Sequence, residues 1–218
     1  LTSSGAANGG LTNTGVGTGA LASLSIDYFA YNNTACGKDA LRNLSDNVNS
    51  YGNTALGNSA LLSATIASNN TAIGMVALGK LNTGSSNTAI GVSSLQNTNG
   101  ADNTAIGSSA AKTNKTGYNN VSIGLQPMFY NTSGYGNTAI GLYALYKNYT
   151  GNENTAMGVT SLYNLQGYSK NVAIGDYEFL RVSLAYQNYD VMLYIDTTVT
   201  YGGFTFPIQN ESPCTVAS

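Results

Sequence analysis

The stretch Asn137-Thr138-Ala139-Ile140-Gly141 decides the fold, because the chain repeats it, with close variants, ten times. A second signal, usually Ala-Leu as in Ala144-Leu145, follows seven and eight residues after the motif Asn. Successive motifs lie 16 to 20 residues apart, and most often 17. Self-similarity at a fixed period is the signature of a repeat architecture. The motif asparagines are Asn13, Asn33, Asn53, Asn70, Asn87, Asn103, Asn120, Asn137, Asn154 and Asn171.

A 17-residue unit is too short for a helical hairpin repeat or a four-stranded propeller blade. It suits one coil of a β-solenoid with two short strands and two turns. The sequence therefore predicts an all-β fold: a single parallel β-solenoid, or β-roll, of about ten coils of 16 to 20 residues. We assign residues 13–180 to this repeat domain and residues 1–12 to an N-terminal lead-in or cap.

The repeat stops after residue 180, and residues 181–218 form a non-repeat β segment in this interpretation. Val191–Ile195, Thr198–Tyr201 and Phe204–Phe206 are rich in β-branched and aromatic residues, which indicates strands. The terminal coils of a solenoid need covering. The segment is therefore expected either to cap its own rod or to link subunits by strand addition.

The alternation of side chains along a strand sets the predicted direction of each residue. With the motif Asn counted as position 1, positions 2 and 4 share one face and position 3 takes the other. Position 4 is mostly Ile, and position 2 is Thr or Val, so both are predicted to face inward. Position 3 is then predicted to face outward as an assembly contact, unless small residues merely suit a tight coil. Its members are Ala35, Ala55, Ala72, Ala89, Ala105, Ser122, Ala139, Ala156 and Ala173.

The invariant Asn and Gly of the motif have structural interpretations. Gly at position 5 indicates a positive φ or a close backbone approach at a corner. Asn at position 1 is expected to stack with the Asn above and below and to satisfy buried polar groups. This predicted structural ladder comprises Asn33, Asn53, Asn70, Asn87, Asn103, Asn120, Asn137, Asn154 and Asn171.

Composition excludes several classes of function. The 218 residues include 8 Lys or Arg, 10 Asp or Glu and no His, and only 8% are charged against about a quarter in ordinary domains. Nucleic-acid binding is not expected without a basic stripe, and membrane insertion is not expected without a long apolar run. We expect no cofactor, no metal and no enzymatic activity. Asp176 and Glu178 are the only close acidic pair near an end of the rod, and we do not expect catalysis there.

Three surface features leave alternatives open. Asn114, Asn131 and Asn148 are the best candidates for glycosylation, since their sequons share one turn phase. The rings of Tyr31, Tyr51, Tyr118 and Tyr135 recur two residues before a motif Asn, where they are expected to pack along the strand edge, to contact sugars or to pack on a neighbouring subunit. Cys36 and Cys214 either form one disulfide or remain two thiols.

The run from Asn137 to Leu145 resembles the head repeats of YadA-type trimeric autotransporter adhesins, and it is similar to repeats in phage and large-virus fibre proteins. This resemblance implies a left-handed parallel β-roll, often trimeric, that serves as an extracellular spacer or adhesive head. We therefore expect a structural subunit of an extracellular, cell-surface or virion-surface fibre or filament, whose partner is itself through the faces and ends of the solenoid. The alternative is an adhesin head that binds a cell-surface receptor or glycan.

Overall fold

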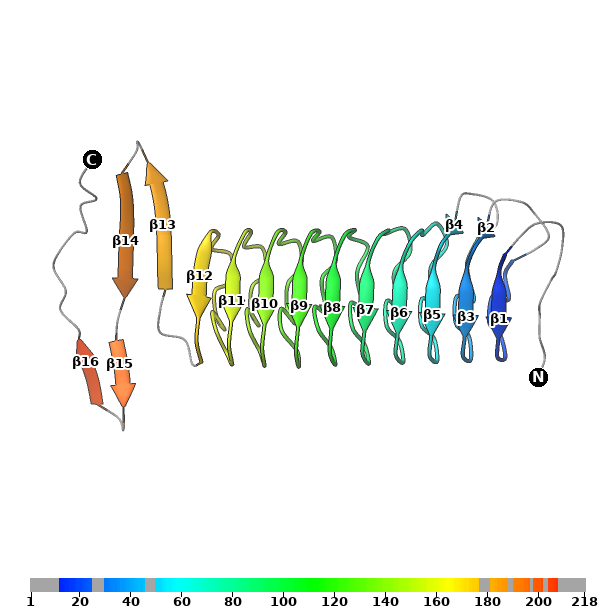
Figure 1. Ribbon diagram of the computed structural model, residues 1–218, viewed down its shortest axis with the longest axis horizontal. Coiled ribbons are helices and arrows are strands. Elements are labelled where there is room, and N and C mark those ends of the chain that lie inside the picture. The colour runs from blue at the N-terminus through cyan, green and yellow to red at the C-terminus, as the bar shows by residue number, and fades with distance from the viewer. Residues whose placement is uncertain are drawn as a thin grey trace.

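The computed structural model describes residues 12–24, 30–45, 50–176, 181–187, 190–196, 198–201 and 204–207, with side chains as far as residue 176. These residues form a rod of stacked coils, which confirms the predicted parallel β-solenoid (Figure 1). Each coil contributes one short strand to a single sheet that runs the length of the rod. The described residues contain no helix.

The strands of the rod coincide with positions 2 to 4 of the repeat. They pair in parallel and in register, so that Thr138 lies beside Thr155 and Ala139 beside Ala156. They are β1 (Thr14–Val16), β3 (Thr34–Cys36), β5 (Thr54–Leu56), β6 (Thr71–Ile73), β7 (Thr88–Ile90), β8 (Thr104–Ile106), β9 (Val121–Ile123), β10 (Thr138–Ile140), β11 (Thr155–Met157) and β12 (Asn171–Ile174). We call this sheet the strand wall.

The interior of each coil is narrow, and small side chains from the strand wall meet leucines from the opposite side. A Cβ placed on Gly15, at position 3, would lie 3.4 Å from Cδ1 of Leu21, at position 9. Ala139 and Leu145 occupy the same two positions in a later coil, and both are fully buried. Positions 8 to 14 of each repeat therefore form a second wall, the back wall, across the interior from the strands.

The predicted direction of the strand residues is wrong. Position 3 faces the interior: Ala35, Ala55, Ala72, Ala89, Ala105, Ser122, Ala139, Ala156 and Ala173 are all buried. Positions 2 and 4 face outward instead. Alternation correctly separated the two sets, but it did not say which set is inside. Because the leucine of position 9 already fills the interior, only a methyl-sized side chain fits opposite it, and the predicted assembly column is in fact part of the core.

The back wall also differs from prediction, because it is built largely from turns. Neighbouring coils still form backbone hydrogen bonds there; for example, Leu95 N donates to Ala110 O at 2.9 Å. The backbone is nonetheless left-handed at position 7 and again at position 9, with φ of 57° at Ser93 and 47° at Leu95. A residue at positive φ cannot continue an extended strand. Outside the strand wall and the C-terminal segment, the described residues pair only in the short strands β2 (Ala30–Tyr31) and β4 (Ser50–Tyr51) and at one isolated bridge.

Glycine at position 5 turns the chain from the strand wall to the next edge, as predicted. At Gly124 φ is 132°, and an added Cβ would lie 2.6 Å from the carbonyl oxygen of Gly141 in the following coil. Real Cβ atoms do not approach an oxygen so closely, so both the backbone conformation and the stacking distance require glycine.

The sheet continues past the repeat into antiparallel strands. β13 (Arg181–Gln187) pairs with β12, and β14 (Asp190–Asp196) pairs with β13. A separate hairpin joins β15 (Thr198–Tyr201) and β16 (Phe204–Pro207). The strands predicted near residues 191–195, 198–201 and 204–206 are thus present, whereas β13 was not predicted. β13 meets the last coil through two residue pairs, Asn171 with Ser183 and Val172 with Val182.

Candidate functional sites

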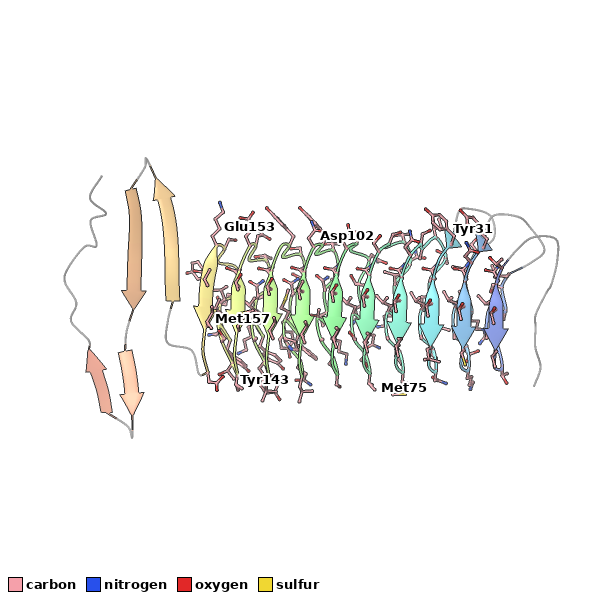
Figure 2. The ribbon with its side chains drawn as sticks, viewed as in Figure 1. Tyr31, Met75, Asp102, Tyr143, Glu153 and Met157 are labelled. Carbon is pink, nitrogen blue, oxygen red and sulfur yellow. The ribbon has the colours of Figure 1, made fainter. Side chains whose placement is uncertain are left out.

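The outer face of the strand wall presents two straight rows of side chains. Threonine dominates the row at position 2, and aliphatic residues dominate the row at position 4. The position 4 side chains are partly exposed along the whole rod. The exposed fraction is 42% at Val16 near one end, 37% at Ile106 in the middle and 68% at Ile174 near the other end. Met157, labelled in Figure 2, belongs to this row. A continuous exposed apolar row on a protein surface commonly marks a contact site.

No charged residue occurs in either row. Position 2 reads Thr14, Thr34, Thr54, Thr71, Thr88, Thr104, Val121, Thr138, Thr155 and Val172. Position 4 reads Val16, Cys36, Leu56, Ile73, Ile90, Ile106, Ile123, Ile140, Met157 and Ile174. Ten coils at about 4.8 Å per step give a wall about 43 Å long. The outer face of the strand wall is therefore a long, uncharged surface with the period of the coil.

The motif asparagines form the predicted ladder inside the rod. Asn120 Oδ1 accepts the backbone N–H of Asn137 at 3.0 Å and its Nδ2 at 3.1 Å. The second Nδ2 proton of Asn137 goes to the carbonyl oxygen of Gly151, at the end of the same coil, at 2.8 Å. Each asparagine thus closes its own coil and binds the coil before it. The same bonding repeats along Asn33, Asn53, Asn70, Asn87, Asn103, Asn120, Asn137 and Asn154, and Asn171 donates to Asn154 in the same way.

The three asparagines proposed for glycosylation form a second, shorter ladder in the back wall. Asn131 Nδ2 donates to Asn114 Oδ1 at 2.8 Å, and Asn148 Nδ2 donates to Asn131 Oδ1 at 3.3 Å. All three side chains are fully buried. A glycan needs an exposed amide nitrogen, so the predicted acceptor role of Asn114, Asn131 and Asn148 is wrong. Their shared turn phase reflects stacking in the interior.

This second ladder ends abruptly. Position 12 of the following coil is Leu165, which is buried and has no polar side-chain atom. Asn148 Oδ1 is consequently a buried oxygen without a hydrogen-bond partner. A buried acceptor in this state lowers stability. The ladder end is therefore a weak point of the back wall, although the same residue still donates to Gly151 O at 2.9 Å.

An aromatic patch covers the outer side of the back wall in three successive coils and extends to position 7 at the adjoining edge. Phe129, Tyr146 and Tyr163 occupy position 10 and stack along the rod, with ring centroids 5.5 and 5.0 Å apart. Tyr130 and Tyr143 meet Tyr146 edge to face at 5.2 and 5.1 Å. Tyr149 lies 6.2 Å from Tyr130 and completes the patch. The sequence signal, an aromatic residue at position 10 of three consecutive repeats, was present but was not singled out.

Lysines accompany these rings. Lys112 Nζ lies 5.6 Å from the centroid of Phe129, and Lys147 Nζ lies 5.6 Å from that of Tyr163. Partial burial raises the pKa of the Tyr146 hydroxyl above its usual value, and the neighbouring tyrosines Tyr130, Tyr163 and Tyr143 add to this shift. A tyrosine hydroxyl is protonated at neutral pH even without such a shift, and it can both donate and accept a hydrogen bond.

The other tyrosines singled out in the sequence pair with one another. Tyr31 stacks on Tyr51 with centroids 5.1 Å apart, and Tyr118 stacks on Tyr135 at 4.9 Å. Tyr31 lies along the edge of the rod that also carries Asp102 and Glu153, whereas Tyr143 lies along the other edge (Figure 2). These rings support packing along the strand edge, which was one of the predicted alternatives.

The remaining candidates form no centre in the described residues. Asp176 Oδ1 accepts the backbone N–H of Val159 at 2.8 Å, while Glu178 lies outside the described part of the chain. Cys36 forms no disulfide there, and Cys214 also lies outside it. Among the residues with described side chains, no group of three His, Cys, Asp or Glu gathers as a metal site requires. No helix in the described chain has the length and apolarity to cross a bilayer.

Two surfaces thus stand out, the uncharged outer face of the strand wall and the aromatic patch of the back wall. Comparison of the chain with protein-family models, with curated proteins and with solved structures gave no significant match.

Proposed function

We propose that the protein is a structural subunit of a fibre or filament on the outside of a cell or a virion, and that copies assemble through the outer face of the strand wall. The observation that carries this proposal is the partly exposed apolar row at position 4, which continues along the rod. In water such a row favours burial against another apolar surface.

A second copy of the chain is the partner that fits this surface. The outer face repeats at every coil, so a surface with the same period meets it equally well along the whole length. Another copy has that period by construction. The absence of charge from positions 2 and 4 means that identical faces meet without repulsion between like charges. Identical faces that meet each other form a contact with two-fold symmetry, which closes as a dimer, the commonest symmetric assembly.

The end of the rod offers a second contact for growth into a filament. β14 is the last strand of the long sheet, so among the described strands its outer edge pairs with no neighbour. An open strand edge is a template for pairing with another chain. The double variant Met192→Lys/Tyr194→Lys places charges on β14, which oppose edge pairing, and is expected to stop end-to-end growth, seen by negative-stain microscopy, while lateral association persists.

Charge reversal of the apolar row tests the lateral contact. The double variant Ile106→Asp/Ile140→Asp places two carboxylates on the outer face, where they add no volume to the interior. We expect its mass by light scattering to fall from a multiple of 22.5 kDa to that of a single chain, with the β signal in circular dichroism unchanged.

The matched control is Ser133→Asp, which adds a carboxylate at an exposed position of the back wall. It is expected to leave the mass of the assembly unchanged. A wild-type protein that is monomeric at high concentration, or a double variant that retains its mass, would contradict the proposal.

A further inference from the structure

The aromatic patch is not required by the fold. Position 10 holds Gly79 and Gln96 in two preceding coils, and those coils have the same backbone and the same buried ladder. Large side chains therefore gather at this position for a reason other than coil formation. Tyr130 and Tyr149 are the most exposed rings of the patch, at 38% and 41%. Contiguous exposed aromatic surface of this kind marks a binding site.

Within the back wall of these coils the charged side chains are of one sign. Lys112, Lys115 and Lys147 belong to the back wall of these coils, whose positions 8 to 14 contain no Asp or Glu from residue 110 to residue 167. The acidic residues Asp102 and Glu153 lie along the edge of the rod away from Tyr143 (Figure 2). In a chain of net charge -2, this is a local cationic surface, and it favours an anionic ligand.

The stacking of the rings indicates which anion fits. Phe129, Tyr146 and Tyr163 cover one another's faces at about 5 Å, so no space remains for a planar base to insert between them. What they present outward is a line of ring edges and hydroxyl groups along the rod. Tyrosine hydroxyls both donate and accept hydrogen bonds, as sugar hydroxyls do, and the exposed rings of Tyr130 and Tyr149 offer apolar surface to the C–H face of a pyranose.

We propose that the aromatic patch binds an acidic glycan, a sugar chain bearing carboxylates, laid along the rod across the coils from Lys112 to Tyr163. The lysines pair with the carboxylates, and the tyrosines contact the sugar rings and hydroxyls. The patch lies on the back wall, across the interior from the proposed assembly face. Glycan binding and self-assembly therefore use different surfaces and are independent of each other.

A hyaluronan octasaccharide is a suitable probe, and its carboxyl-reduced form is the matched neutral ligand. Calorimetric titration of the full chain is expected to show binding of the acidic form that weakens as NaCl rises from about 50 mM to about 500 mM, because salt screens exposed charges. The reduced form is expected to bind at least about tenfold more weakly.

Two single variants each replace one residue of the proposed site with the residue that an earlier coil carries at the same position. Tyr146→Gln copies Gln96 and Lys147→Asn copies Asn97, so folding is preserved and circular dichroism verifies this. Each is expected to lower the affinity at least about tenfold. The controls are Tyr135→Ser, in another aromatic pair, and Lys80→Asn, at position 11 of an earlier coil; both should bind like wild type.

Four results would overturn the proposal: no binding of the acidic octasaccharide, equal binding of the reduced form, an equal loss in the control variants, or tighter binding of a single-stranded oligothymidine that is lost in the same variants. Light scattering on the same samples reports assembly separately. Failure of the glycan site is thus distinguished from failure of the assembly face.

Discussion

The strand wall and the back wall differ in how much their outward-facing residues vary from coil to coil. The strand wall is uniform: its outward rows change little from coil to coil, and its inward row is small throughout. The back wall is buried equally well on its inner side, but its outer positions vary from Gly79 to Tyr163. A uniform outer face suits contact with another repeating surface, whereas a variable one allows a local site. The interior is thus constrained in both walls, whereas the exterior varies only in the back wall.

The walls also carry ladders of different strength. An asparagine of the motif ladder such as Asn120 makes four side-chain hydrogen bonds, one of them to the backbone of the next coil. In the back wall, Asn131 makes three such bonds and Asn148 makes two. The motif ladder therefore ties successive coils together through their backbone. The back-wall ladder joins three coils through side chains and ends at the unpaired Asn148 Oδ1.

The largest expected effect comes from enlarging the inward row of the strand wall. Ala139→Leu adds three carbon atoms where the interior is already filled by leucine from the opposite wall. Overpacking of this kind is expected to lower the free energy of unfolding by more than about 3 kcal/mol, measured by urea denaturation. The control is Thr138→Val, on the outer face of the same strand, which copies Val121 and should change stability by less than about 0.5 kcal/mol. Similar stabilities for the two variants would contradict the observed direction of the strand residues.

The next effect is a graded series across the two ladders. Asn120→Ala, Asn131→Ala and Asn148→Ala are expected to lower the free energy of unfolding by about 3, about 2 and about 1 kcal/mol, because they remove progressively fewer hydrogen bonds and leave fewer buried partners unpaired. Thermal and urea unfolding measured in parallel give the order. If Asn148→Ala proved as damaging as Asn120→Ala, the motif ladder would have no special role in joining the coils.

The smallest effect concerns pH and belongs to the back wall. The pKa of Tyr146 is raised in the folded protein, so the neutral hydroxyl is favoured there. This contribution to stability is fully present below the unfolded value of about 10 and is lost as pH rises through the raised folded value. Between about pH 8 and about pH 12, the melting temperature should fall less steeply with pH for Tyr146→Gln than for wild type. Parallel curves would show that Tyr146 titrates as it does in the unfolded chain.

The sequence alone determined the period, the coil and the motif ladder. Ten copies of one motif at a spacing near 17 leave few architectures, and an Asn or a Gly in every copy predicts a stacked polar row and a corner with positive φ. These features are local or strictly periodic, so they are visible without knowing what lies across the interior. The stacked polar row is confirmed at Asn137, and the corner with positive φ is confirmed at Gly124.

The side of each strand that faces inward depends on what lies across the coil, which the sequence pattern does not show. Alternation separates Ala139 from Thr138 and Ile140, but hydrophobicity alone assigns the larger Ile to the core. The width of the coil reverses that choice, because Leu145 from the back wall occupies the space and leaves room for a methyl group. The same width places Asn131 inside, where its sequon pattern suggested the surface. The aromatic patch likewise depends on stacking, since only the coil brings Phe129, Tyr146 and Tyr163, each 17 residues apart in sequence, into contact.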